Sequence, residues 1–183
     1  MNHSFMSSVS SGLAERGIST LRYQFPFMQR GSKRPDPPPV AHATVRAVVA
    51  HAHSLLPELP LFAGGKSFGG RMTSQAQAQD PIKQVRGLIF LGFPLHPAGK
   101  PSLQRAAHLA EVGCPMLFLQ GTRDELAAVD LMHSVTAELG ERATLQWFAD
   151  ADHSFHVRAR SGLTDQQVLN SLCDAISAWI ASR

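Results

Sequence analysis

Residues 59–70 read Leu-Pro-Leu-Phe-Ala-Gly-Gly-Lys-Ser-Phe-Gly-Gly, a short apolar stretch that runs directly into a Gly-x-Ser-x-Gly sequence centred on Ser67. Residues 71–79 contain neither Gly nor Pro and favour a helix. Strand, tight turn and helix are therefore expected in this order. Gly65 and Gly69 stand two residues before and after the serine, where a sharp reversal of the chain leaves little room for side chains.

Such a turn would present the Ser67 hydroxyl beside the first N–H groups of a helix, which favour developing negative charge. The N–H of Phe68 is the expected hydrogen-bond donor to an oxyanion. The alternative is a glycine-rich loop with an incidental serine, because a short pattern of this kind also arises by chance. The rest of the chain has to decide between the two.

The composition indicates one globular domain over residues 1–183. Of the 183 residues 44% are hydrophobic and 17% are charged, which is enough apolar material for a sizeable core. No apolar run approaches the ~20 residues of a membrane span, and the N-terminus lacks the features of a signal peptide. We therefore expect a cytoplasmic protein that does not bind membranes.

Cysteine usage and charge suggest neither a metal site nor a nucleic-acid partner. Cys114 and Cys173 lie far apart without a metal-binding spacing, so neither a disulfide framework nor a zinc site is expected, and no cofactor is implied. The net charge is +3, but basic residues are scattered except for those at 30–34, which suit a solvated loop.

Helices and strands are predicted to alternate along the chain. The proline-rich stretch 28–39 is expected to be a surface loop, and the apolar run 85–93 a central strand covered on both faces. This pattern predicts an α/β fold with a mainly parallel sheet and helices on both faces. Helices are expected over 3–16, 41–56, 71–79, 102–112, 129–139 and 164–180, and further strands over 18–25, near Leu61, and over 115–120 and 143–148.

Three residues with complementary chemistry each follow a predicted strand, in the order Ser67, Asp124 and His153. Because parallel strands end at the same edge of a sheet, we expect the three side chains to converge. A serine hydroxyl becomes a good nucleophile when an imidazole accepts its proton and a carboxylate orients that imidazole. Alternative readings are a helix-capping Ser, a capping Asp and a loop His. Asp150 and Asp152 are rival acids whose positions suit a turn, and His156 is a rival base.

A substrate would be bound at the same edge of the sheet. Phe93, Leu95 and His96 directly follow the central strand, and with Phe68 they are the expected substrate-lining residues. For His96, a loop residue hydrogen-bonded to the backbone is an equally good interpretation. The connection 94–114 is too short for a lid domain, so the site should be open and the acyl substrate small or accessible.

Several motifs resemble one known family: residues 23–26 (YQFP), 65–71 (GKSFGGR), 93–97 (FPLHP), 119–124 (LQGTRD) and 152–155 (DHSF). They resemble the bacterial α/β-hydrolases grouped with testis-expressed protein 30 and a chromatin-complex subunit, the KANL3/Tex30 family. The resemblance implies an α/β-hydrolase fold similar to dienelactone hydrolases and small carboxylesterases, with Ser67, Asp124 and His153 as nucleophile, acid and base. Dienelactone hydrolases proper have a cysteine where this chain has Ser67.

The chain departs from this fold at its N-terminus. Members have a strand and a His-Gly-x-Gly type loop before the first helix, and the loop supplies the second oxyanion N–H. Here Met1 stands where that loop should be finishing, so the first strands are expected to be missing. One of them normally lies between the predicted strands at 18–25 and at Leu61. We expect either that the start of the sequence is truncated or misassigned, or that these two strands pair directly or borrow a strand from a partner, as in a homodimer.

Together these features predict a carboxylesterase-like serine hydrolase that cleaves a small ester or acyl substrate through an acyl-Ser67 intermediate, without metal or organic cofactor. The alternative is a non-catalytic α/β-hydrolase-like scaffold or binding protein. The apparently missing oxyanion loop favours this alternative, as does the resemblance to eukaryotic proteins that look like scaffold subunits.

Overall fold

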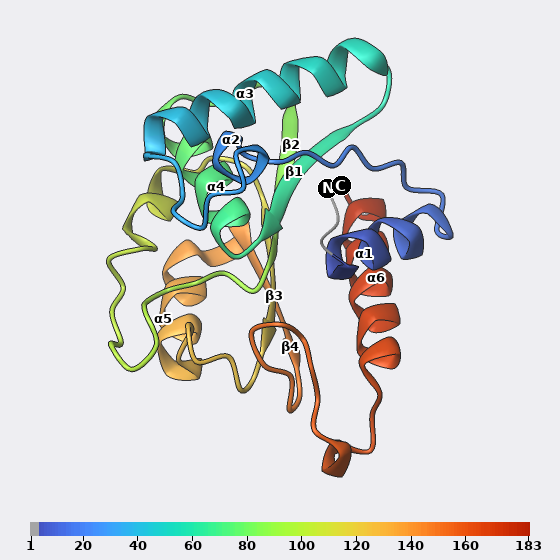
Figure 1. Cartoon of the computed structure of the whole chain (residues 1–183), viewed down its shortest axis with the longest axis vertical. Coiled ribbons are helices and arrows are strands. Elements are labelled where there is room, and N and C mark those ends of the chain that lie inside the picture. Colours follow the sequence, from blue (N-terminus) through green and yellow to red (C-terminus); the bar gives the residue numbers. More distant parts are fainter. Residues whose placement is uncertain (1–3) are drawn as a thin grey trace.

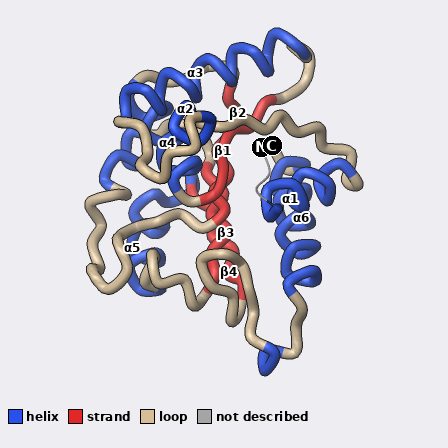
Figure 2. The backbone as a smooth tube through the Cα atoms, in the orientation of Figure 1, coloured by secondary structure: helices blue, strands red, loops and turns tan. Residues whose placement is uncertain are grey.

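A computed structural model describes residues 4–183 of the chain. Its centre is a four-stranded parallel sheet with the strand order β1-β2-β3-β4, which runs through the middle of the molecule in Figure 2. Residues 1–3, where the sequence places the end of the missing loop, lie outside the described residues. The strands are β1 (Leu61–Lys66), β2 (Val85–Leu91), β3 (Met116–Gly121) and β4 (Ala143–Phe148).

Helices cover both faces of the sheet, as predicted (Figure 1). One face is covered by α1 (Ser4–Ala14) and α6 (Asp165–Ala181), and the other by α3 (Pro38–Leu55), α4 (Phe68–Gln79) and α5 (Val129–Leu139). Shorter helical elements lie in the connections: α2 (Pro26–Gln29), η1 (Ala107–Glu111), η2 (Gly140–Arg142) and η3 (Ala159–Ser161). None of the described helices combines the length and the apolar character that crossing a bilayer requires.

The hydrophobic core has two layers because successive side chains of a strand point to opposite faces. Phe90 and Phe118 belong to the layer under α3, α4 and α5, and their ring centroids lie 4.8 Å apart. Leu91 and Leu119 belong to the layer under α1 and α6. The near-continuous apolar run of β2 is thereby explained, since both of its faces are buried.

The segment predicted as a strand over 18–25 is not a strand, which corrects the sequence-based expectation. It runs in irregular conformation and is held by its ends: the Ile18 N–H donates to the Leu13 carbonyl, and the buried Phe25 ring lies 5.2 Å from that of Phe68. A strand requires a neighbouring strand for its backbone hydrogen bonds. Within residues 4–183 β1 is paired on one side only, with β2, and the predicted direct pairing does not occur.

An apolar groove of about 600 Å³ separates this segment from the free edge of β1. Its walls include the irregular segment at 17–23, parts of α1 and α3, and β1 itself. Exposed leucines at the end of α3 and just before β1 adjoin it, among them Leu55, Leu56 and Leu59.

The prediction of a helix over 102–112 is also wrong. Only Ala107–Glu111 is helical, and this stretch is a 3-10 helix. The Ser102 hydroxyl accepts a hydrogen bond from the Gln104 N–H, and such local side-chain bonds compete with helix formation. This connection between β2 and β3 contains no inserted lid domain.

Substituting alanine for Gly64 should destabilise the protein strongly. A Cβ atom at this position would overlap the backbone carbonyl of Ile89 in the paired strand β2. Backbone atoms cannot move away without breaking the ladder, so we expect Gly64→Ala to lower the free energy of unfolding by about 3 kcal/mol in urea denaturation. Gly113→Ala is the matched control, because a Cβ there meets nothing, and its effect should stay within about 0.5 kcal/mol. Equal effects of the two substitutions would contradict the strand packing described here.

Candidate active site

Ser67 occupies a tight turn between β1 and α4 with backbone angles φ 51° and ψ −115°. Residues other than glycine rarely adopt a positive φ, and such strain persists only where the surrounding structure imposes it. Here the Ser67 N–H donates to the Leu91 carbonyl at the end of β2, and the Ser67 carbonyl accepts from the Arg71 N–H in α4. The turn is thus fixed from both sides.

The glycines around the turn allow β1 and α4 to touch. A Cβ atom at Gly70 would lie only 2.7 Å from the carbonyl oxygen of Gly65, so the first turn of α4 packs directly on the strand that precedes it. Phe68 is the first residue of α4, and its N–H belongs to those that have no acceptor within the helix. The predicted strand, turn and helix are therefore present in the predicted order.

Asp124 and His153 form a hydrogen-bonded pair beyond the ends of β3 and β4. The His153 Nδ1 atom lies 2.7 Å from the Asp124 Oδ2 atom. The Asp124 carboxylate is fully buried and also accepts hydrogen bonds from the Gln120 side chain and the Leu126 N–H. A buried carboxylate requires such donors. The His153 side chain keeps 24% of its surface exposed, so its ring remains accessible.

Ser67 and His153 flank the same point of the sheet, the end of β2. Ser67 is bonded to Leu91, as described above, and a side chain at the next residue, Gly92, would come within 3.4 Å of the His153 ring. The Lys66 ammonium donates to the His153 carbonyl. Among the described residues, no hydrogen bond joins the Ser67 hydroxyl to His153. Such bonds are often long in the absence of a ligand.

The rival residues have other roles. Asp152 accepts hydrogen bonds from the N–H groups of Ser154 and His156, at 2.7 and 3.1 Å, and thus forms the turn that carries His153. His156 is exposed and pairs with Asp165 at 2.9 Å, and this carboxylate raises the pKa of His156. Of the acids considered, Asp124 is the one that contacts His153.

Phe93, Leu95 and His96 lie at the carboxyl edge of the sheet as predicted, but their side chains point into the core. Phe93 and Leu95 are at most 1% exposed. The His96 ring is 3% exposed; its Nε2 atom accepts from the Ala128 N–H and its Nδ1 atom lies 2.9 Å from the Pro97 carbonyl. In this structure the three side chains therefore do not face an open site, and His96 has the backbone hydrogen bonds of the alternative interpretation.

Two supporting residues were not predicted from the sequence. Gln120 is fully buried and connects the Phe93 N–H to the Asp124 carboxylate, so it fixes the orientation of that carboxylate. Its signal in the sequence is a polar side chain at the end of an otherwise apolar strand.

Lys66, directly before Ser67, is the second supporting residue. Its ammonium lies 4.9 Å from the ring centroid of Phe5 and 5.4 Å from that of Phe155. Burial lowers the pKa of Lys66 to about 8, although the charges of Asp124 and Asp152 act in the opposite direction. The same ammonium holds the carbonyl of His153, so it ties the Ser67 turn to the His153 loop.

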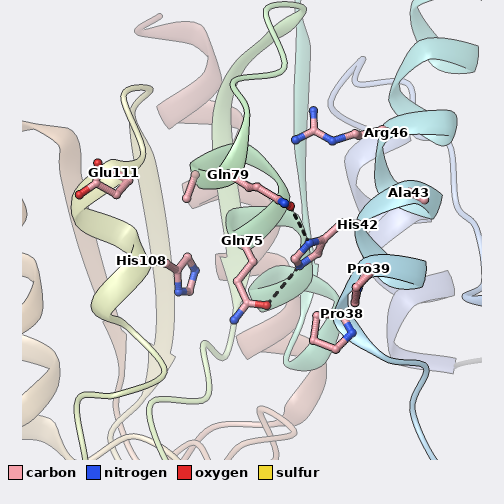
Figure 3. Close-up of a pocket in the computed structure, with 10 residues that line it drawn as sticks. Pro38, Pro39, His42, Ala43, Arg46, Gln75, Gln79, His108 and Glu111 are labelled. Carbon is pink, nitrogen blue, oxygen red and sulfur yellow. Dashed lines mark hydrogen bonds between the residues drawn. The ribbon is translucent and has the colours of Figure 1, made fainter.

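A second groove of about 640 Å³ is lined by residues of α3, α4 and η1 (Figure 3). His42 of α3 reaches across to Gln75 and Gln79 of α4, and His108 stands on the opposite wall. Neither this groove nor the one along β1 is lined by Ser67, Asp124 or His153. Within residues 4–183 no three His, Cys, Asp or Glu side chains are grouped so that they could hold a metal ion.

Solved structures of serine hydrolases and related proteins share this fold. A serine hydrolase without a lid from Xanthomonas campestris is 23% identical, with a TM-score of 0.74 over 98% of this chain and 75% of that one. A dienelactone hydrolase from Anabaena variabilis is 17% identical, with a TM-score of 0.76 over 99% of this chain and 80% of that one. An alpha-beta serine hydrolase homologue from Coxiella burnetii is 20% identical, with a TM-score of 0.71 over 94% of this chain and 77% of that one.

At these identities the solved structures show a common fold, and they confirm the predicted fold class. The sequence profile of the family described as "Alpha/beta hydrolase domain" matches residues 1–181, nearly the whole chain. The chain belongs to the α/β-hydrolase domain family.

Proposed function

We propose that this protein is a serine hydrolase of the carboxylesterase type, in which Ser67 is the nucleophile, His153 the general base and Asp124 the residue that orients His153. The observation that carries the proposal is the 2.7 Å hydrogen bond between His153 and a buried Asp124, at the sheet edge where Ser67 sits in a strained turn. The order Ser, Asp, His along the chain is that of α/β-hydrolases.

The reaction follows from proton chemistry. Because Asp124 occupies Nδ1 of His153, the free Nε2 atom accepts the Ser67 proton as the hydroxyl oxygen attacks the acyl carbon. The N–H of Phe68 stabilises the negative oxygen of the tetrahedral intermediate. His153 then gives the proton to the leaving alcohol, and the acyl-Ser67 bond is hydrolysed by a water molecule that His153 activates in the same way.

The N–H of Phe68, the first residue of α4, is the oxyanion donor that we assign. The short connections at the carboxyl edge favour small, accessible acyl groups. Covalent labelling of the nucleophile tests the proposal without knowledge of the preferred acyl group.

A fluorophosphonate probe should label the wild-type protein at Ser67, because the activated hydroxyl attacks phosphorus as it attacks an acyl carbon. Intact-mass spectrometry should show one adduct on the wild type and on His156→Ala, and none on Ser67→Ala. If folded wild-type protein takes up no label and does not hydrolyse short 4-nitrophenyl esters, the non-catalytic binding protein is the correct alternative.

Replacing Asp124 by Asn should lower kcat on a 4-nitrophenyl ester on the order of 10³- to 10⁴-fold, because an amide cannot stabilise the His153 cation or hold its reactive tautomer. Asp152→Asn is the matched control, since Asp152 hydrogen-bonds to the turn and not to the ring. Its effect should be below about 10-fold. A larger loss of kcat in Asp152→Asn than in Asp124→Asn would show that Asp124 is not the acid that orients His153.

The pH dependence of stability should reveal the buried ammonium of Lys66. Its pKa falls from 10.5 to about 8 on folding, so between these pH values the unfolded chain binds more protons than the folded one. The contribution of Lys66 to stability therefore rises with pH in this window and is constant below it. In urea denaturation from pH 7 to 10, the free energy of unfolding of the wild type relative to Lys66→Met should rise. Parallel profiles would contradict the burial of a charged Lys66.

A further inference from the structure

Strained backbone gathers in two segments of the candidate active site. Among residues 4–183, the residues other than glycine with a positive φ lie in the turn of Ser67 or in the loop that carries His153. Ser67 has φ 51°, and Asp150 and Phe155, on either side of His153, have φ 56° and 62°. Such conformations persist only where surrounding contacts impose them. The contacts that join these two segments therefore decide where the catalytic groups stand.

The Lys66 side chain joins the two strained segments. Lys66 directly precedes Ser67, and its ammonium donates a hydrogen bond to the His153 carbonyl with a distance of 2.5 Å between nitrogen and oxygen. Within residues 4–183, no backbone N–H donates to this carbonyl. The ammonium is thus the group that fixes the backbone of His153 relative to the Ser67 turn.

Two aromatic rings contact the same ammonium. The Phe5 ring of α1 and the Phe155 ring of the His153 loop are nearly parallel, with 5° between their planes and 5.6 Å between their centroids. The Lys66 ammonium lies 4.9 Å from the Phe5 centroid and 5.4 Å from the Phe155 centroid. The face of a ring attracts a cation and not a neutral amine. The contact with Phe155 therefore acts on the strained end of the loop and depends on the charge of Lys66.

The charge of Lys66 depends on the groups that surround it. Burial lowers its pKa to about 8, and the carboxylates of Asp124 and Asp152 act in the opposite direction. Helix α1 presents the uncharged Phe5 ring, and the His153 loop presents an uncharged ring and a carbonyl. Lys66 is therefore an ammonium at pH 7 and loses its proton as the pH rises through about 8.

We propose that Lys66 is a positioning residue, whose ammonium holds the loop of His153 so that the imidazole ring meets the Ser67 hydroxyl. The inference rests on the proposed hydrolase function and adds a residue that acts through His153 rather than on the substrate. Lys66 fixes the backbone of His153, whereas Asp124 fixes its ring. When the ammonium loses its proton, the contacts with the rings and the carbonyl weaken, and turnover falls although Ser67, His153 and Asp124 are intact.

The first test is the hydrolysis of 4-nitrophenyl acetate at pH 7. Lys66→Met removes the charge and keeps a long side chain; kcat should fall about 10- to 100-fold, as for a lost charged hydrogen bond, and KM should change by less than about 3-fold. Lys66→Arg keeps a charge and should recover most of kcat. The matched control Lys83→Met removes a charge from an exposed position before β2 and should equal the wild type.

Two outcomes of this test would overturn the proposal. A kcat of Lys66→Met equal to that of the wild type would show that the ammonium does not position His153. A Lys66→Arg variant no better than Lys66→Met would show that the shape of the lysine, and not its charge, is what the site requires.

The second test is the pH dependence of kcat from pH 7 to 9.5, after subtraction of spontaneous hydrolysis. The wild type and Lys83→Met should lose activity as the pH rises through about 8, where Lys66 loses its charge. Lys66→Arg should not show this loss, because a guanidinium stays charged over the whole range. Lys66→Met should be low and flat. An alkaline loss in Lys66→Arg equal to that of the wild type would assign the loss to another group and reject the role of Lys66.

Amide hydrogen exchange tests the contact without turnover. At pH 7, the amides of residues 150–157 should exchange about 10-fold faster in Lys66→Met than in the wild type, and equally fast in Lys83→Met. Phe5→Leu is the second variant, in case Lys66→Met does not fold; it removes one ring and should accelerate this exchange about 3-fold. Unchanged exchange in these variants would reject the hold of Lys66 on the loop. If exchange changes as expected but the wild type neither takes up a fluorophosphonate nor hydrolyses esters, the hydrolase proposal has failed and not the contact.

Discussion

The close contact between β1 and α4 is the constraint on which the site depends. The backbone of α4 at Gly70 rests on the Gly65 carbonyl, and the backbone of β1 at Gly64 rests on that of β2. With both elements pressed together, the residue that joins them has to adopt a positive φ, and that residue is Ser67. The same contact lets α4 bury Met72 and Ala76 in the core layer on its face of the sheet. The packing of α4 on β1 therefore also determines the position of the Ser67 hydroxyl.

The parallel sheet then gathers the remaining groups. Because β1, β3 and β4 are parallel, Ser67, Asp124 and His153 follow strand ends at one edge of the sheet. Ser67 and His153 both lie beside the end of β2, and Asp124 is hydrogen-bonded to His153. Neighbouring side chains hold Asp124 and His153 in position: the Gln120 amide donates to the Asp124 carboxylate, and the Lys66 ammonium donates to the His153 carbonyl. A charged lysine adjacent to the nucleophile is tolerated because two aromatic rings and a carbonyl replace its hydration.

Local patterns in the sequence were sufficient for several strands of the sheet and for the helices that cover it. The helix Val129–Leu139 and the strand Ala143–Phe148 have their predicted bounds, because each follows from periodicity and from the glycine at 140. The segment 18–25 has an equally good strand pattern and is not a strand, since pairing depends on a neighbour that no local pattern reports.

Side-chain direction was the second limit of sequence-based prediction. The sequence located Phe93 and His96 at the correct edge of the sheet, but whether they face substrate or core depends on how the chain turns after Gly92. The pairing of Asp124 with His153 could be predicted from their positions after strands. The roles of Gln120 and Lys66 could not, because each is defined by a contact with a residue more than twenty positions away.

The central claim is that the strained turn places the Ser67 hydroxyl where the ring of His153, oriented by Asp124, can accept its proton. A crystal structure of the protein after reaction with a fluorophosphonate tests it most directly. The account predicts a phosphorus atom bonded to the Ser67 oxygen, a phosphonyl oxygen that accepts the Phe68 N–H, and the His153 Nε2 atom within hydrogen-bond distance of the adduct, with the His153–Asp124 bond retained. An adduct on another residue, or a His153 ring turned away from Ser67 and from Asp124, would contradict it.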